Sequence, residues 1–309
     1  HDGVEQAAQV SGKFQYEALG PSDYPTVGDE VLADLNGGGQ AVIHKVLPRK
    51  SLFLRKAAGT AREEQPVAAN VDILFLCMAL NNDFNLRRLE RYLAAAWNSG
   101  ATPVVVLTKA DLCGDPSEKV AAVEEAAPGT DVLLTSAAQE DGIRPLLPYL
   151  TSGRTVAFVG SSGVGKSTLM NGLLGKEILA TGGLRNDDRG RHTTTRRQMF
   201  FLPGGAALID TPGMRELGLW DSESGLETAF ADIEALARQC RFQDCRHEKE
   251  PGCAVRAALA SGELSEERFR SWQRLSAENR YADDRAAHMS AKEKKFRMIA
   301  QFNKSNAKR

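Results

Sequence analysis

The chain has 309 residues, 42% of them hydrophobic and 26% charged, and its formal net charge at pH 7 is −1. This composition is typical of folded globular proteins, the length allows two or three domains, and the balanced charge excludes a partner selected by overall charge alone. No stretch of about 18 apolar residues is long enough to span a membrane, and no charged-then-apolar segment resembles a secretory signal, so we expect a cytoplasmic protein with no membrane partner.

Residues 1–68 contain short runs of alternating polar and apolar residues, separated by Gly, Pro, Asn and Asp. Such alternation indicates β-strands with one buried face, and the Asn-Gly-Gly-Gly segment at 36–39 is typical of a tight turn. We therefore predict a first domain, residues 1–68, that is a small antiparallel β-barrel. The predicted strands lie within Glu5–Val10, Val31–Leu35, Ala41–Val46 and Leu52–Leu54.

From Val71 onwards, apolar runs alternate with segments of helical periodicity. Strands that alternate with helices indicate a parallel sheet covered on both faces, here a second domain over residues 69–221. The predicted helices are 86–98, 117–125 and one that begins at Lys166. The predicted strands are 71–78, 103–107, 132–135, 155–159, 196–202 and 206–210.

After residue 222 the apolar runs that are typical of strands disappear, and a third, helical domain over residues 222–309 is predicted. Segments 265–277 and 291–301 have the periodicity of amphipathic helices. From residue 285 to the end, the chain carries eight Lys or Arg residues and one acid, Glu293, so the tail is basic.

A glycine-rich segment between a predicted strand and a predicted helix matches the pattern G-x-x-x-x-G-K-S. In such a loop the backbone N–H groups turn towards phosphates, Lys166 reaches the β- and γ-phosphate oxygens, and Ser167 can bind Mg²⁺. The alternative, a chance glycine-rich turn, is disfavoured by the flanking strand and helix. The predicted phosphate site comprises Gly160, Ser161, Ser162, Gly163, Val164, Gly165, Lys166, Ser167 and Thr168.

Two further segments have the pattern of switch regions. Asp210 ends a strand and is placed to hold the metal through water, and Gly213 offers an amide to the γ-phosphate. Between the loop and Asp210 lies a threonine cluster, of which Thr194 or Thr195 can complete the magnesium shell; the spacing does not distinguish the two.

The segment Thr108-Lys109-Ala110-Asp111 ends another predicted strand. The Asp111 carboxylate can accept both the ring N–H and the exocyclic amine of guanine, which adenine cannot offer together, while the Lys109 stem lies along the base. Ser136 and Ala137 are expected to present backbone N–H groups to the guanine carbonyl. Alone this pattern also fits a solvated loop, but together with the phosphate loop it favours guanine.

The order of these segments is unusual, because the base-recognition segments precede the phosphate loop. The domain therefore has the order of a circularly permuted GTPase. The position after Gly213, where many GTPases have a water-orienting glutamine, holds Met214. We expect slow unaided turnover and hypothesise that His192 orients the water once a partner orders its loop; an exposed loop histidine without a role is the alternative.

Four residues within 14 positions offer three thiols and one imidazole. This donor set is typical of a tetrahedral structural zinc site, and three reduced core cysteines are the alternative. We predict one zinc ion, bound by Cys240, Cys245, His247 and Cys253.

A basic cluster near the end of the predicted barrel suggests binding to RNA phosphates, although a solvated face is an equally ordinary explanation. The cluster comprises Lys45, Arg49, Lys50, Arg55 and Lys56.

Several segments resemble the RsgA (YjeQ) family of ribosome small-subunit-dependent GTPases. They are residues 24–29, 48–49, 82–88 and 190–195 and the cysteine motif from Cys240 to Val255. The resemblance implies an OB-fold barrel, a permuted GTPase domain and a zinc-bearing helical domain, and we expect the barrel to be incomplete at its first strand.

The same resemblance implies GTP hydrolysis in late maturation of the 30S subunit, stimulated by that subunit and coupled to release from it. The implied partners are the 30S subunit, 16S rRNA and guanine nucleotide with Mg²⁺. We also expect a monomer. A nucleotide-latched RNA-binding factor and a P-loop ATPase or small-molecule kinase are the alternatives. Since the second switch leads directly into residues 222–309, we expect γ-phosphate sensing at Gly213 to reorient that domain and time the release.

Overall fold

The computed structural model of the chain describes residues 5–35, 39–56, 64–139, 141–179, 197–211 and 223–280. The chain forms two compact units, residues 1–218 and 219–309, which are considered separately below. His192, Thr194, Thr195 and Gly213 lie outside the described residues, as do Met214 and the helix expected over 291–301.

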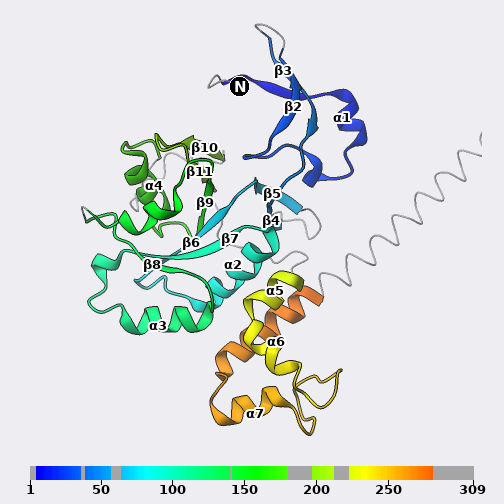
Figure 1. The fold of residues 1–309 in the computed structure, drawn as a ribbon, viewed down its shortest axis with the longest axis vertical. Coiled ribbons are helices and arrows are strands. Elements are labelled where there is room, and N and C mark those ends of the chain that lie inside the picture. The colour runs from blue at the N-terminus through cyan, green and yellow to red at the C-terminus, as the bar shows by residue number, and fades with distance from the viewer. Residues whose placement is uncertain are drawn as a thin grey trace, which may run out of the picture. The chain divides into compact units, whose positions relative to one another are not determined.

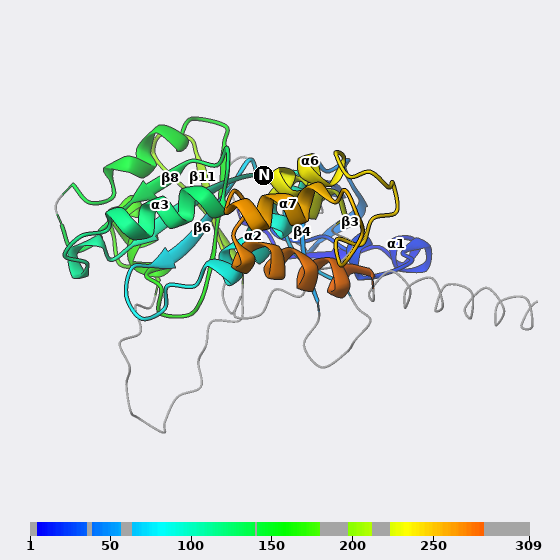
Figure 2. The ribbon, with the colours of Figure 1, turned by 90° about the horizontal axis from the view of Figure 1, so that it is seen from below.

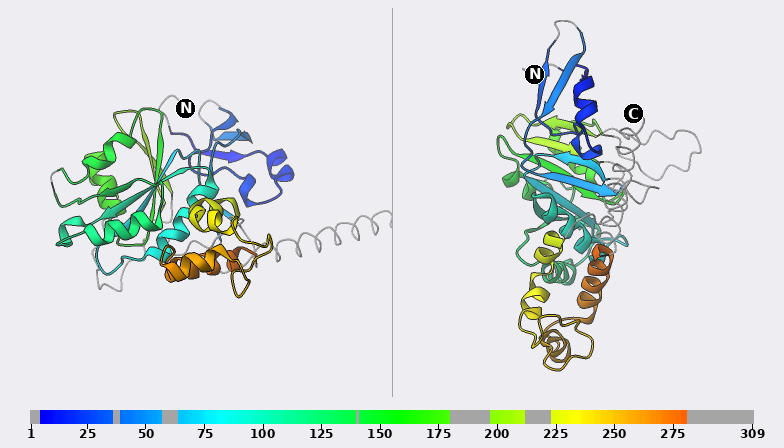
Figure 3. Two further views of the ribbon diagram at one scale, coloured as in Figure 1. Left: turned by 60° about the horizontal axis from the view of Figure 1, so that its bottom comes forward. Right: turned by 90° about the vertical axis from the view of Figure 1, so that its right-hand side faces the viewer.

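The N-terminal part of the first unit is rich in β-structure, as expected, and Figure 3 shows it in blue. Strands β1 (Ala8–Val10), β2 (Val31–Asp34) and β3 (Ala41–Val46) form a sheet in the order β1-β3-β2, while β4 (Leu52–Lys56) pairs with β5 (Glu64–Ala69). Within the described residues these are two small sheets, and β1 is parallel to β3 rather than antiparallel.

Two helical segments in this part did not stand out in the sequence. Helix α1 (Gly12–Glu17) begins after Ser11, whose side chain accepts a hydrogen bond from the Phe14 N–H, and η1 spans Pro21–Asp23. Both are short, so neither has enough turns to produce a helical periodicity.

A six-stranded sheet forms the core of the first unit, in the order β10-β11-β9-β6-β7-β8 (Figure 1). Five neighbouring strands of this sheet, β11, β9, β6, β7 and β8, are parallel to one another. The edge strand β10 runs antiparallel to β11, so the expectation of a parallel sheet is wrong at this edge. The antiparallel pair arises because Leu202–Ala206 closes a tight connection between its two strands. The strands are β6 (Ile73–Ala79), β7 (Thr102–Thr108), β8 (Val132–Leu134), β9 (Thr155–Gly160), β10 (Gln198–Phe201) and β11 (Ala207–Asp210).

Helices cover both faces of this sheet, as predicted. On one face, side chains of β6 and β9 such as Phe75 and Phe158 pack with Leu146 of η3 (Arg144–Tyr149) and Leu169 of α4 (Lys166–Leu174). Because side chains alternate along a strand, the intervening residues of β6 face the opposite side, where α2 (Leu86–Ser99) contacts β6 and β7. Helix α3 (Ser117–Ala126) packs against α2 and β8.

The second unit is helical within its described residues. It contains α5 (Glu223–Ala229), α6 (Ala231–Ala237), α7 (Ala254–Ser261) and a helix over residues 266–280, coloured yellow to orange in Figure 2. The last of these matches the helix expected at 265–277. Its buried Arg268 holds it to α6 through Asp232, with Nε–Oδ2 and Nη2–Oδ1 distances of 2.6 and 2.7 Å. None of the described helices has the length and apolar character that a membrane crossing needs.

Candidate nucleotide site and cysteine cluster

The carboxyl ends of the parallel strands bring the predicted nucleotide-binding segments to one edge of the sheet. The phosphate loop follows β9 and leads into α4, whose first residues are Lys166, Ser167 and Thr168. Gly165 caps this helix with φ of 106°, and Gly163 has φ of 77°. A helix that begins directly after such a loop presents its free N–H groups and the positive end of its dipole to an anion.

Gly160 is required for a further reason. Its backbone passes so close to β6 that a Cβ atom there would lie 2.5 Å from the Cys77 carbonyl oxygen. Only glycine allows the loop to leave the strand at this point.

The side chain of Lys166 is buried inside the loop. Its Nζ donates to the carbonyl oxygens of Gly160 and Ser161 at 2.6 and 2.8 Å. Burial lowers the pKa of this lysine, while nearby Cys77, Asp210 and Asp83 act to raise it. The lysine is thus held in the centre of the loop by backbone carbonyls and by negative charge nearby.

Asp210 lies at the end of β11 and is 8% exposed. Burial raises the pKa of its carboxyl group, and the attraction of Lys166 opposes this rise. A hydroxyl on the first turn of α4, at Ser167, and the Asp210 carboxylate are oxygen donors of the kind that Mg²⁺ prefers, so this donor set fits the predicted metal.

The base-recognition loop is attached directly to the phosphate loop. Lys109, with a left-handed backbone (φ 58°), donates from Nζ to the Gly163 carbonyl at 2.7 Å. The Thr108 hydroxyl donates to the Val164 carbonyl at 2.5 Å. The two motifs that the sequence separates by about 50 positions therefore form one continuous surface.

The Asp111 carboxylate is exposed and accepts a hydrogen bond of 2.5 Å from the Ser136 hydroxyl. The Ser136 N–H donates to the Gly142 carbonyl at 2.9 Å. In this structure a neighbouring turn uses that amide, and the expectation that Ser136 offers it to the base stays a prediction. The N–H of Ala137 has no protein acceptor within the described residues and remains the candidate donor.

Asp83 is a residue of this site that the sequence reasoning missed. It lies in the loop after β6, pairs with Arg88 Nη2 at 2.9 Å, and contributes to the electrostatic environment of Lys166. Its position directly after a buried parallel strand was the available signal, since such loops meet at the same edge of the sheet.

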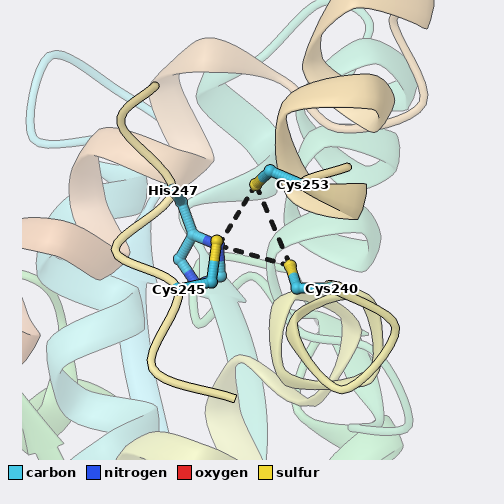
Figure 4. Close-up of side chains that lie close together, drawn as sticks. All are labelled: Cys240, Cys245, His247 and Cys253. Atoms are coloured by element: carbon cyan, nitrogen blue, oxygen red, sulfur yellow. Dashed lines mark hydrogen bonds between the residues drawn. The ribbon is translucent and has the colours of Figure 1, made fainter. Parts of the chain in front are cut away.

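The predicted metal ligands form a second site, in the helical unit (Figure 4). The four ligand atoms lie within 4.8 Å of one another: the Nδ1 of His247 is 3.4 Å from the Cys253 Sγ and 3.6 Å from the Cys240 Sγ, and these two sulfur atoms are 3.9 Å apart. A tetrahedral zinc ion with Zn–S bonds of about 2.3 Å needs sulfur atoms roughly 3.8 Å apart. The four donors, Cys245 included, fit zinc in number, kind and spacing.

The surroundings favour the ligand form of two of these groups, His247 and Cys240, whereas burial raises the pKa of the Cys245 thiol to about 11. Burial lowers the pKa of His247, which keeps the imidazole neutral as a ligand must be. For Cys240, burial acts to raise the thiol pKa, but hydrogen bonds with the amides of Val255 and Ala254 and with the Cys253 and Cys245 side chains together outweigh it, and the pKa is lowered. The His247 ring lies against Trp272, with ring centroids 5.6 Å apart, which fixes its orientation.

The comparisons with known proteins agree with this arrangement. The sequence pattern of the RsgA GTPase family matches residues 46–220, and that of the ABC transporter family matches residues 145–308. The small ribosomal subunit biogenesis GTPase RsgA 2 of Lactiplantibacillus plantarum is 52% identical over 278 residues, which are 90% of this chain and 78% of the relative. The RsgA of Opitutus terrae is 47% identical over 304 residues, 95% of this chain and 83% of the relative.

Two solved structures are similar over most of the chain. YjeQ from Thermotoga maritima has a TM-score of 0.65 and 31% identity, covering 88% of this chain and 89% of that one. YloQ, described as a circularly permuted GTPase, has a TM-score of 0.61 and 24% identity, covering 90% and 88%; at this identity it supports the fold alone.

Fold and site together define a circularly permuted P-loop GTPase: the phosphate loop follows β9, whereas the Thr108–Asp111 loop precedes it in the chain and lies beside it in space. The ABC transporter pattern matches a segment that contains the phosphate loop but not the Thr108–Asp111 loop. The relatives, which are RsgA proteins similar over most of the chain, favour the RsgA GTPase pattern over the ABC transporter pattern. The chain belongs to the RsgA GTPase family.

Proposed function

We propose that this GTPase acts in late maturation of the 30S ribosomal subunit, that the subunit stimulates its turnover, and that hydrolysis is coupled to release from the subunit. The names of its relatives support the pathway. The observation that carries the enzymatic part is the direct bonding of the Lys109 side chain to the phosphate loop, because it joins base and triphosphate recognition in one site. The cytoplasm, where the subunit is assembled, is the proposed location.

The proposed nucleotide site follows from this geometry. Asp111, Ser136 and Ala137 recognise guanine, and the Lys109 stem lies along the base. The loop from Gly160 to Thr168 binds the phosphates, with Lys166 as its cation. Ser167 and Asp210 hold Mg²⁺, joined by Thr194 or Thr195 when GTP is bound. Gly213 senses the γ-phosphate, and His192 orients the attacking water. A magnesium ion there would neutralise charge that develops on the phosphate oxygens.

A single structural zinc ion is proposed for the helical unit, bound by Cys240, Cys245, His247 and Cys253. The spacing of the four ligand atoms and the lowered pKa of His247 support it. With all four positions taken by protein, the ion has a structural role.

We also propose that the protein is a monomer and binds 16S rRNA. Fewer residues of the basic cluster are available to contact RNA than the sequence suggested. Arg49 donates to Asp29 and to the carbonyls of Ser22 and Tyr24, and Lys50 pairs with Asp72 at 2.6 Å, so both stabilise the protein's own fold. The exposed Lys45 is a better candidate for a phosphate contact. If phosphates dominate association, affinity for the subunit should fall steeply with salt.

The decisive experiment measures GTP turnover against 30S concentration, with ATP as the matched control nucleotide. Turnover that rises with 30S and is specific for GTP supports the proposal. Turnover that is the same with and without the subunit favours the alternative, in which nucleotide is only a latch for an RNA-binding factor. A Cys245→Ala variant, first checked for unchanged GTP affinity, tests whether stimulation also needs the zinc-bearing unit.

A further inference from the structure

The loop that carries the predicted zinc ligands is wrapped around one carboxylate, that of Glu250. One of its oxygen atoms, Oε1, accepts from the Arg246 N–H at 3.0 Å. The other, Oε2, accepts from the N–H groups of Glu248 and Lys249 at 2.8 and 2.9 Å. Both oxygen atoms are therefore used by the backbone of the same loop.

Two of these amides belong to the residues on either side of His247. The backbone of His247 is left-handed, with φ of 59°, a conformation that is unfavourable for a residue with a side chain. The Glu250 carboxylate thus binds the chain immediately before and immediately after the strained residue. In this conformation the imidazole faces the sulfur atoms of Cys240 and Cys253.

Glu250 is not itself placed as a ligand. The group of side chains whose ligand atoms converge within 4.8 Å contains three cysteines and one histidine, and the carboxylate is not among them. Hydrogen bonds from backbone N–H groups, its own included, lower the pKa of Glu250 to about 2, so the carboxylate is ionised throughout the physiological range.

We propose that Glu250 is a positioning residue for the metal site: its carboxylate holds the loop in the conformation that presents His247, so that the four ligands are arranged before the metal arrives. The inference rests on the zinc site proposed above. Partners that orient ligands in this way typically change metal affinity 10- to 100-fold when removed.

The chain offers a matched control. Glu248 lies in the same loop and is exposed, and it contributes a backbone N–H rather than its carboxylate to the network. Glu248→Ala removes the same charge from the same loop without removing the acceptor. Glu250→Gln keeps the size but turns an NH₂ group towards backbone N–H donors, so it should be intermediate.

The test uses the full chain loaded with zinc and measures the rate at which a chromogenic chelator takes the metal. We expect zinc loss from Glu250→Ala to be about 10-fold faster or more, and loss from Glu248→Ala to match the unchanged protein. If Glu250→Ala does not fold, the comparison of Glu250→Gln with Glu248→Ala decides. Equal rates for the Glu250 and Glu248 variants overturn the inference.

A second readout separates positioning from ligation. Protein produced with cobalt in place of zinc should show the absorption bands of a tetrahedral three-sulfur, one-nitrogen site, and Glu250→Gln should keep these bands while losing metal faster. Altered bands in that variant mean that the ligand set has changed, and they contradict a purely positioning role. Absence of the bands in the unchanged protein overturns the zinc assignment itself, which distinguishes that failure from the failure of this inference alone.

Discussion

The Nζ of Lys109 donates to the carbonyl oxygen of Gly163 at 2.7 Å, across 54 positions of sequence. This bond joins the base-recognition loop to the phosphate loop even though the chain order of the two is reversed. Contacts at one edge of a parallel sheet depend on which strands are neighbours in the sheet. Strands β7 and β9 both lie beside β6, whichever of the two comes first in the sequence. Circular permutation therefore leaves the nucleotide site intact and changes only which segments of the chain are connected to the two ends of the GTPase domain.

The first prediction concerns base choice. Asp111→Asn removes the acceptor for the guanine ring N–H and amine, and its NH₂ group instead suits the C2 carbonyl of xanthine. We expect the preference for GTP over XTP to reverse, with a loss of GTP affinity that can reach the order of 10⁴-fold. Competition binding with the two nucleotides measures this. A variant that still prefers GTP would remove Asp111 from base recognition.

The turn that holds Ser136 gives a second prediction. A Cβ atom on Gly142 would lie 1.8 Å from the Ser136 carbonyl oxygen, so Gly142→Ala must displace the Ser136 turn and its bond to Asp111. We expect GTP affinity to fall about 10-fold, equivalent to about 1.4 kcal/mol. Gly114→Ala is the control, because a Cβ atom there meets nothing within 4 Å. Equal affinities for the two variants would contradict the role of the turn.

Asp210 should show a conflict between stability and function. Burial raises the pKa of Asp210 above its unfolded value of 3.8. Below pH 3.8 the carboxyl group is protonated in both the folded and the unfolded state, so burying it costs no ionisation energy. As the pH rises from there through the raised pKa, the folded state loses stability, because the unfolded state ionises more readily. Asp210→Asn should therefore make the nucleotide-free protein more stable at pH 7 and shrink the difference at pH 3.5. The same variant should bind Mg²⁺ with GTP 10- to 100-fold more weakly if the metal is held through water. Thermal unfolding at the two pH values, with and without Mg²⁺ and GTP, measures both effects.

His192 is tested by turnover in the presence of 30S subunits. If it orients or deprotonates the water, His192→Ala should lower the stimulated kcat by about 10²- to 10⁴-fold and leave GTP affinity unchanged. The unstimulated rate serves as the internal control, since the hypothesis gives His192 a role only after the partner has ordered its loop. Unchanged stimulated turnover would assign the histidine no part in the reaction.

The sequence predicted most where the signal is local. The strand-loop-helix from Thr155 to Leu174 carries its glycines, its lysine and its apolar runs within 20 consecutive positions, and the structure has the same elements. The cysteine motif is equally local, and its four ligand types meet as expected.

What the sequence did not reveal depends on partners that are distant in the chain. The parallel pairing of β1 with β3 is chosen by neighbours rather than by period-two alternation, which is the same for both directions. The Ser136 N–H donates to the Gly142 carbonyl, and Asp83, in the loop after β6, acts on the pKa of Lys166 in the phosphate loop. The secondary-structure propensity of residues and their hydrophobic periodicity contain no information about contacts between segments that are distant in the chain.

Arg49 illustrates the same point and gives the last prediction. In sequence it belongs to a basic cluster, but in the fold its guanidinium makes a two-pronged pair with Asp29, Nε to Oδ1 and Nη2 to Oδ2, both at 2.7 Å. The Asp29 side chain is 1% exposed, so Arg49→Ala would leave a buried carboxylate without its cation. We expect a loss of about 3–5 kcal/mol in the stability of the first unit, measured by urea unfolding.

Lys45→Ala is the control for that experiment, because Lys45 is exposed, and its effect on stability should stay within about 0.5 kcal/mol. Adding Asp29→Asn to Arg49→Ala should recover part of the loss, since the uncompensated charge is then gone. If Arg49 instead served rRNA, Arg49→Ala would leave unfolding unchanged and weaken 30S binding. That result would return Arg49 to the RNA-binding surface.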